Sequence, residues 1–157
     1  MLLEVGPSGQ PSRLELATPA GLLTAHPEPS QATLHGNVVT VDGVRPIILP
    51  WGETAAIVVV GEPISLAVTI ASIRQRGTGE AVIRVPVVEV DPALRVGSAD
   101  WVVRPEGAAR WRAERATEPG TTTWIEIDDD GILRAVDGTS VDRDQWSLED
   151  ADPAGER

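Results

Sequence analysis

Four residues in the C-terminal half of the chain could together bind an anionic ligand: Arg110, Trp111, Arg112 and Arg115. The planar guanidinium of arginine matches the oxygen atoms of a phosphate or carboxylate, and the flat face of tryptophan is a surface on which a ring can stack. Trp111 lies between two arginines in the sequence, which makes it a candidate platform for an anionic ring ligand. We therefore predict a ligand-binding site at these four residues.

Other groups of polar residues have simpler explanations. The two histidines, His26 and His35, lie in a proline-rich segment with no third ligand nearby in sequence, so we interpret them as surface residues. Glu126 and the run Asp128–Asp130 supply the carboxylates that a hard cation needs, but they lack the ligand spacing of an EF-hand. A solvated hairpin turn explains the run, and we predict no metal site and no cofactor.

The sequence carries no motif of a known catalytic class. It lacks the Gly-x-Ser-x-Gly elbow of hydrolases, and without lysine it cannot form a Walker-type phosphate loop. It also lacks cysteine, so a thiol nucleophile and a thiolate metal site are excluded. Paired carboxylates that folding brings together stay an alternative, because their partnership is spatial. We predict no catalytic residues.

Charge restricts the class of partner. The formal net charge is -11, and residues 76–157 hold 18 acidic residues against ten arginines. This balance disfavours a nucleic-acid backbone and an anionic membrane surface, since both are bound by basic residues. We expect a protein partner, and a basic one would fit the acidic C-terminal half. Residues 101–115 are the exception, with four arginines against two glutamates.

The N-terminal residues and the hydropathy pattern bear on location. The chain begins Met-Leu-Leu-Glu-Val, without the basic leader of a signal peptide. It has no run of about 18 apolar residues that could cross a bilayer. We therefore expect a cytoplasmic protein.

The aromatic residues are all tryptophans, because phenylalanine and tyrosine are absent. Every large aromatic position in the core must then be tryptophan, so we expect most of the five to be buried, with Trp111 as the exception. The five are Trp51, Trp101, Trp111, Trp124 and Trp146.

The segment Ile57–Val90 is the centre of the predicted fold. It contains three apolar runs, Ile57–Val60, Ile64–Ile70 and Ala81–Val90, and apolar residues alternate with small or polar ones in the second run. Such a period of two is typical of a half-buried strand. We therefore predict three strands here, with a hairpin turn at Gly77-Thr78-Gly79.

Turn signals organise the rest of the chain. Asp42-Gly43 and Asp128–Gly131 each predict a hairpin, and Pro46 predicts that its strand lies at a sheet edge or carries a bulge. Gly107–Glu118 is the one segment for which we predict a helix.

These elements predict an all-β fold, a small antiparallel β-barrel or sandwich of about seven to nine strands with at most one short helix. Residues 1–146 would form a single β-rich domain, in which 101–146 could be a sub-lobe. Residues 147–157 are acidic and are predicted to be a disordered tail.

The region Trp101–Val136 resembles the PilZ family of cyclic di-GMP receptors, which are often preceded by a flagellar-brake type β-barrel. That family carries an Arg-x-x-x-Arg switch and an Asp/Asn-x-Ser-x-x-Gly turn. Here Glu126, Asp128 and Gly131 have the spacing of the turn, but Asp128 stands at the serine position and the arginines are two and three residues apart. The resemblance implies a degenerate member, because two carboxylates would repel a phosphate at that turn.

We conclude from the sequence that a non-catalytic β-barrel binding or assembly module, acting through protein–protein contacts, is the leading hypothesis. The alternative is a degenerate PilZ-like sensor that binds an anionic nucleotide such as cyclic di-GMP through the arginine cluster. An enzyme built on the histidines and the aspartate run is a third hypothesis with less support.

Overall fold

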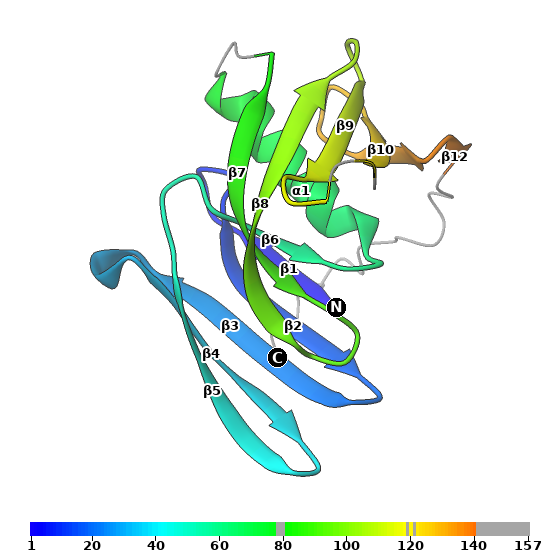
Figure 1. The fold of residues 1–157 in the computed structure, drawn as a ribbon. Coiled ribbons are helices and arrows are strands. Elements are labelled where there is room, and N and C mark those ends of the chain that lie inside the picture. Colours follow the sequence, from blue (N-terminus) through cyan, green and yellow to red (C-terminus); the bar gives the residue numbers. More distant parts are fainter. Residues whose placement is uncertain (78–80, 119, 121, 141–157) are drawn as a thin grey trace, which may run out of the picture.

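The structure is a computed structural model that describes residues 1–77, 81–118, 120 and 122–140. Over these residues the chain is mostly β, with two sheets and one α-helix (Figure 1). This confirms the predicted fold class, although the described residues form twelve strands, more than expected. The predicted tail at 147–157 and Trp146 lie outside the described residues. No helix among the described residues is long and apolar enough to span a membrane.

The first sheet is an antiparallel meander of five strands in sequence order. The strands are β1 (Leu2–Val5), β2 (Pro11–Thr18), β3 (Gly21–Glu28), β4 (Thr33–Thr40) and β5 (Gly43–Pro50), with a 3-10 turn, Pro29–Gln31, before β4. The predicted hairpin is confirmed, but its two-residue loop is Val41-Asp42 and not Asp42-Gly43, because β4 and β5 pair up to Thr40 and Gly43. Pro46 lies on the edge strand β5, as predicted, where its missing N–H costs no ladder bond.

The second sheet has seven strands in the order β12-β11-β10-β9-β8-β7-β6. Its elements are β6 (Ala56–Val59), β7 (Ile83–Val90), β8 (Val96–Pro105), β9 (Arg110–Arg115), β10 (Thr122–Ile127), β11 (Leu133–Val136) and β12 (Thr139–Ser140). β6 and β7 pair in parallel, whereas the other neighbours are antiparallel. A parallel pair needs a crossover, and helix α1 (Pro63–Arg76) supplies it.

The prediction of a strand at Ile64–Ile70 is wrong, because this run lies within α1. Proline occupies the first turn, where its missing N–H is harmless, and Gly77 ends the helix in the left-handed conformation with φ 61°. The residues buried against the sheet include Leu66, Ala67, Ile70 and Ile73, which follow helical spacing. Gly77 is therefore a helix cap, and the rest of the predicted hairpin turn, Thr78 and Gly79, lies outside the described residues.

The prediction of a helix at Gly107–Glu118 is also wrong, because this segment contains strand β9. Burial alternates along the strand: Trp111 and Ala113 are buried, whereas Arg110 is exposed. Pairing with β8 and β10 satisfies both edges of β9 with backbone hydrogen bonds. The hairpin predicted around Asp128–Gly131 is confirmed, since β10 and β11 pair across it.

The hydrophobic core has two clusters that meet at β6. The second sheet curves around α1, which contacts β6 on one side and β10 and β11 on the other. Ala56 and Val58 of β6 belong to this helix-side cluster, whereas Ile57 and Val59 pack toward the first sheet. Among the described residues, the cluster against the first sheet contains none from β9 or β10. The first sheet thus does not pack against the outer face of β9 and β10, which lie away from it in Figure 1.

Candidate functional site

The four residues predicted to bind a ligand do not share one face. Successive side chains of a strand point to opposite sides, so Arg110 and Arg112 lie on the outer face of β9 while Trp111 and Arg115 lie on the helix side. Trp111 is only 7% exposed and belongs to the core. It is therefore a core residue like Trp51 and offers no surface on which a ligand could stack.

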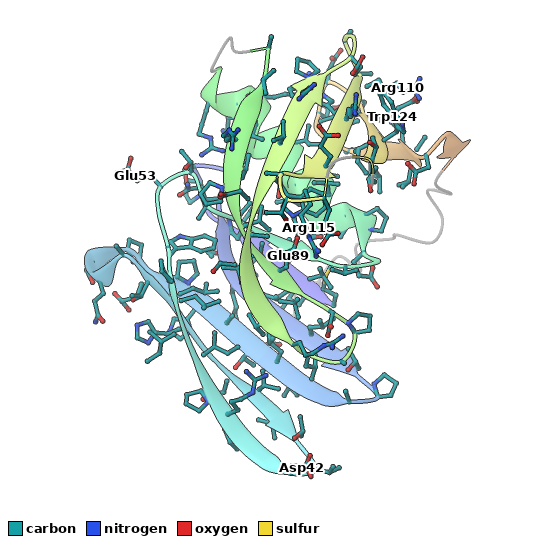
Figure 2. All side chains as sticks on the ribbon, in the orientation of Figure 1. Asp42, Glu53, Glu89, Arg110, Arg115 and Trp124 are labelled. Carbon is teal, nitrogen blue, oxygen red and sulfur yellow. The ribbon has the colours of Figure 1, made fainter. Side chains whose placement is uncertain are left out.

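Trp124 of β10, and not Trp111, is the tryptophan whose ring contacts the arginines of β9. It pairs directly with Arg112 across the two strands. The Arg110 guanidinium carbon lies 4.4 Å from the centre of the Trp124 ring, and that of Arg112 lies 5.9 Å away. Both distances are typical of cation–π contacts, and Figure 2 shows Arg110 beside Trp124. No local sequence pattern indicates this contact, because it depends on the register of β9 and β10.

Arg104 of β8 extends this group across a third strand. It pairs directly with Arg112, so two positive side chains face each other on the sheet. Glu114 lies between them and is only 7% exposed. Its Oε2 accepts a hydrogen bond of 2.9 Å from Arg112 Nη2, and its Oε1 lies 3.6 Å from Arg104 Nη2. We call Arg104, Arg110, Arg112 and Trp124, with Glu114 between the arginines, the arginine face.

Several hydrogen-bond donors of the arginine face have no acceptor in the described part of the chain. The Nε atoms of Arg104 and Arg112 are buried and unpartnered there. Glu114 engages only the Nη2 atom of each of these two arginines. Arg110 lies 4.0 Å from Glu126, at the limit of an ion pair, and both side chains are exposed. The buried Nε atoms are out of reach of a ligand, but all three arginine side chains are partly exposed, so the ends of their guanidiniums can donate to a bound anion.

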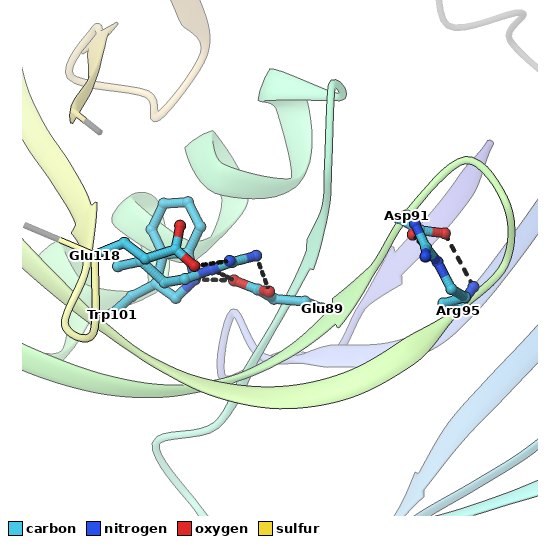
Figure 3. Close-up of polar contacts among 6 residues, drawn as sticks. Glu89, Asp91, Arg95, Trp101 and Glu118 are labelled. Atoms are coloured by element: carbon cyan, nitrogen blue, oxygen red, sulfur yellow. Dashed lines mark hydrogen bonds and ion pairs between the residues drawn. The ribbon is translucent and has the colours of Figure 1, made fainter. Parts of the chain in front are cut away.

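Arg115 belongs to a separate polar cluster on the helix side of the sheet. Its Nε donates to Glu89 Oε1 at 2.9 Å, and Nη2 donates to the second oxygen of the same carboxylate. The Trp101 indole N–H donates to Glu89 as well, and Arg115 Nη1 donates to Glu118 at 3.0 Å (Figure 3). The hydrogen bond to Glu89 raises the pKa of Arg115 above its ordinary value. Glu89 is well covered, with a side chain 13% exposed.

A cavity of about 370 Å³ adjoins this cluster at the carboxyl end of β6 and the start of α1. Val58, Leu66 and Trp101 line it, and the carboxyl end of a parallel strand is a common place for ligands. Two carboxylates already engage Arg115, and two further acidic residues, Glu62 and Asp137, also line the cavity. An anion therefore gains less here than at the arginine face.

The two histidines lie beside each other, although no sequence pattern indicates this. His26 and His35 are directly opposite each other on β3 and β4, with ring centres 6.4 Å apart. His35 Nε2 also lies 2.8 Å from the hydroxyl of Thr33. Within the residues that the structure describes, no group of three or more His, Cys, Asp or Glu is placed to hold a metal ion.

The aspartate run is organised by its first member. Asp128 Oδ1 accepts hydrogen bonds from the backbone N–H groups of Asp130 at 3.1 Å and Ile132 at 2.8 Å, and Oδ2 accepts one from Arg134. These bonds lower the pKa of Asp128, the bond from Ile132 most of all. The carboxylate thus fixes the β10–β11 turn.

Comparison with known proteins bears on the fold. No family model matches the sequence, and no curated protein matches it either. The structure is similar to the crystal structure of a DUF1089 family protein from Pseudomonas aeruginosa, with a TM-score of 0.51. The two chains are 13% identical, and the match covers 88% of this chain and 94% of the other. At that identity the likeness shows the fold alone, so the function has to be argued from the residues.

Proposed function

We propose that this protein is a non-catalytic binding module that contacts a partner protein through the arginine face. The observation that carries the proposal is the pair of guanidiniums, Arg110 and Arg112, set against Trp124 on an open sheet surface. Arginine and tryptophan are the residue types in which binding energy at protein interfaces concentrates. β9 is paired on both edges, so the side chains are held on a rigid support. A cytoplasmic location is part of the same proposal.

The arginine face favours an acidic segment of the partner. Three adjacent rows of side chains on this outer face carry four arginines and two glutamates, namely Arg84, Arg104, Arg110, Arg112, Glu114 and Glu126. The acidic C-terminal half led us to expect a basic partner, but six of its 18 acidic residues belong to 141–157. Salt screens the interaction between exposed charges that are more than about 8 Å apart. The charge of the arginine face itself, rather than that of the whole chain, therefore decides which partner segment binds there.

An anionic nucleotide, as in the PilZ-like hypothesis, is the second candidate. The observation that favours it is the same contact of Trp124 with two arginines, since an aromatic ring beside guanidiniums can bind a base and its phosphates. Glu126 opposes it, because this carboxylate is 43% exposed beside Arg110 and would repel a phosphate. Arg115 points to the other side of the sheet, so it adds nothing to such a site. We therefore rank the nucleotide below the acidic segment.

Nuclear magnetic resonance of the uniformly 15N-labelled full chain tests the proposal. Three probes are titrated separately: the acidic peptide Gly-Glu-Leu-Glu-Leu-Gly, the basic peptide Gly-Lys-Leu-Lys-Leu-Gly, and cyclic di-GMP. We expect the acidic peptide to shift the indole N–H of Trp124 and the amides of β8 to β10, and we expect Arg110→Gln to weaken that response. Arg84→Gln, which removes a charge farther from Trp124 on the same face, is the matched control.

Each other outcome rejects the proposal in its present form. Shifts with the basic peptide alone would place the binding surface elsewhere and restore the basic partner. Shifts with cyclic di-GMP alone would put the nucleotide sensor first. If no probe shifts these resonances, the arginine face is not a binding surface for either class of ligand.

A further inference from the structure

The pairing of Arg104 with Arg112 is unfavourable for the unliganded chain. Like charges at directly opposite positions of neighbouring strands destabilise a sheet. Glu114 offsets this repulsion with one negative charge, and it is held between the two guanidiniums. The three side chains together keep an excess of one positive charge. A second anion at this point would therefore relieve repulsion that the folded chain cannot remove by itself.

The N–H donors of Arg104 and Arg112 are placed where they could bind a second anion. Glu114 accepts a hydrogen bond from Nη2 of Arg112 and lies 3.6 Å from Nη2 of Arg104, and within the described residues no group accepts a hydrogen bond from Nη1 of either arginine. Both side chains are partly exposed, so these nitrogen atoms belong to groups that a ligand can approach. Arginine N–H donors in a planar fork suit the two oxygens of a carboxylate.

The neighbours of the pair select a carboxylate on an apolar segment. Trp124 continues the same row of side chains on the adjacent strand, about 4.8 Å from the backbone of Arg112. An apolar residue next to the bound carboxylate would pack on its ring. Glu114 and Glu126 disfavour a doubly charged phosphate, because each would repel it more strongly than it repels a single carboxylate.

We propose that Arg104 and Arg112 form a seat for one side-chain carboxylate of an acidic partner segment, and that Glu114 is an internal counter-ion that partly neutralises the two guanidiniums before the partner binds. The proposal rests on the proposed function, because it names the ligand chemistry of the same face. It adds a role for Arg104 and Glu114 that the sequence did not suggest. It also predicts that replacing Arg104 weakens binding without lowering the stability of the unliganded fold.

The test measures affinity and thermal stability on the same full-length variants. A fluorescently labelled Gly-Glu-Leu-Glu-Leu-Gly peptide is the probe, and the melting temperature of each unliganded chain is recorded. We expect Arg104→Gln and Arg112→Gln to weaken binding by about 10- to 100-fold, the range for hydrogen bonds to charged groups. The melting temperature of unliganded Arg104→Gln should stay equal to or above that of the parent, since this substitution removes like-charge repulsion and breaks no hydrogen bond among the described residues. Arg112→Gln also removes the hydrogen bond to the buried Glu114, so it should melt at a lower temperature. Arg84→Gln serves as the control for the loss of one positive charge.

Glu114→Gln separates the role of an internal counter-ion from a purely structural role. It leaves the two arginines without their shared carboxylate, so the unliganded melting temperature should fall while affinity for the peptide rises and becomes more sensitive to salt. A residue that merely supports the fold would lower both stability and affinity. A fall in both values therefore refutes the role of Glu114.

Two further variants distinguish failure of the seat from failure of the proposed function. If Arg110→Gln and Trp124→Leu weaken binding while Arg104→Gln and Arg112→Gln bind like Arg84→Gln, the seat is refuted and the binding face stands. If the peptide does not bind, or if no variant of the face weakens it, both are refuted. Equal affinity for inorganic phosphate and for the peptide would refute the selectivity for a carboxylate on an apolar segment.

Discussion

The side chain of Asp128 makes several of the hydrogen bonds that hold the β10–β11 turn. Its carboxylate accepts two backbone N–H groups of the turn and pairs with Arg134. These bonds favour the charged form in the folded state, which is why the pKa of Asp128 lies below its ordinary value. Asp129, its neighbour in the sequence, has a fully exposed side chain at 104% and only a 3.4 Å contact with Arg74.

The lowered pKa of Asp128 predicts a pH-dependent difference between the parent and Asp128→Asn. A carboxylate whose folded pKa is depressed stabilises the fold above its unfolded pKa of about 4, and this contribution is lost as pH falls through the lower folded pKa. Asparagine keeps an oxygen acceptor but cannot titrate. We expect the parent to melt at a higher temperature than Asp128→Asn at pH 6, and the gap to shrink below pH 4.

Thermal unfolding followed by circular dichroism between pH 2 and pH 7 measures this gap, with ionic strength held constant. Asp129→Asn is the matched control and should show almost no gap at any pH. A difference for Asp128→Asn that is constant over the whole range would mean that the charge of Asp128 does not contribute.

At the same scale, the sequence identified part of the candidate site. Arg110 and Arg112 were singled out by composition, because four arginines within 101–115 stand out in an acidic chain. Trp111 was chosen because it is adjacent to them in sequence, yet adjacency in a strand places side chains on opposite faces. Trp124 and Arg104 join the site only through the register of β8, β9 and β10, which depends on contacts between separate segments.

Among the elements, local turn chemistry was predictable and the central crossover was not. The β4–β5 and β10–β11 hairpins form where aspartate and glycine indicate tight turns. Helix α1 was missed because Ile64, Leu66, Val68 and Ile70 satisfy a period of two over seven residues, too short a window to exclude a helix. Proline at its start and glycine after its end were the better signals. The parallel pairing of β6 and β7 brings together residues 31 positions apart, beginning with Ala56 and Val87, which no local pattern specifies.

Gly36 in β4 tests how closely the strands of the first sheet approach each other. A Cβ atom at this position would lie 2.1 Å from the backbone oxygen of Thr24 and 2.9 Å from Ala25 Cα, so β3 or β4 would have to move. We expect Gly36→Ala to lower the free energy of unfolding by about 2 kcal/mol or more. Urea denaturation measures this change.

Gly97→Ala is the control for a glycine in a strand. No atom lies within 4 Å of a Cβ built at Gly97, so its effect should stay within about 0.5 kcal/mol. Equal effects of the two substitutions would show that the close approach of β3 and β4 around Gly36 does not limit stability.

For the molecule as a whole, β6 connects the two hydrophobic clusters. Ile57 and Val58 are neighbours in this strand, yet the first packs toward the first sheet and the second toward α1. β7 divides its residues in the same way, with Val87 on the helix side and Val88 on the other. Neither cluster can lose its packing without exposing one face of these two strands. The clusters should therefore unfold together, as one cooperative unit.

Trp51 and Trp111 report on the two clusters separately, since Trp51 belongs to the cluster against the first sheet and Trp111 to the helix-side cluster. Incorporation of 5-fluorotryptophan gives each a 19F resonance, which Trp51→Phe and Trp111→Phe assign. We expect both native resonances to lose intensity at the same urea concentration, because β6 and β7 couple the clusters. If residues 101–146 were instead a sub-lobe with its own stability, the Trp111 resonance would disappear at a different urea concentration while that of Trp51 persisted or had already gone. Val58→Ala, compared with the parent chain, makes the test stricter, because Val58 belongs to the helix-side cluster. If the two clusters are coupled, this substitution should lower the urea midpoints of both resonances by the same amount. If they unfold separately, it should lower only the midpoint of the Trp111 resonance.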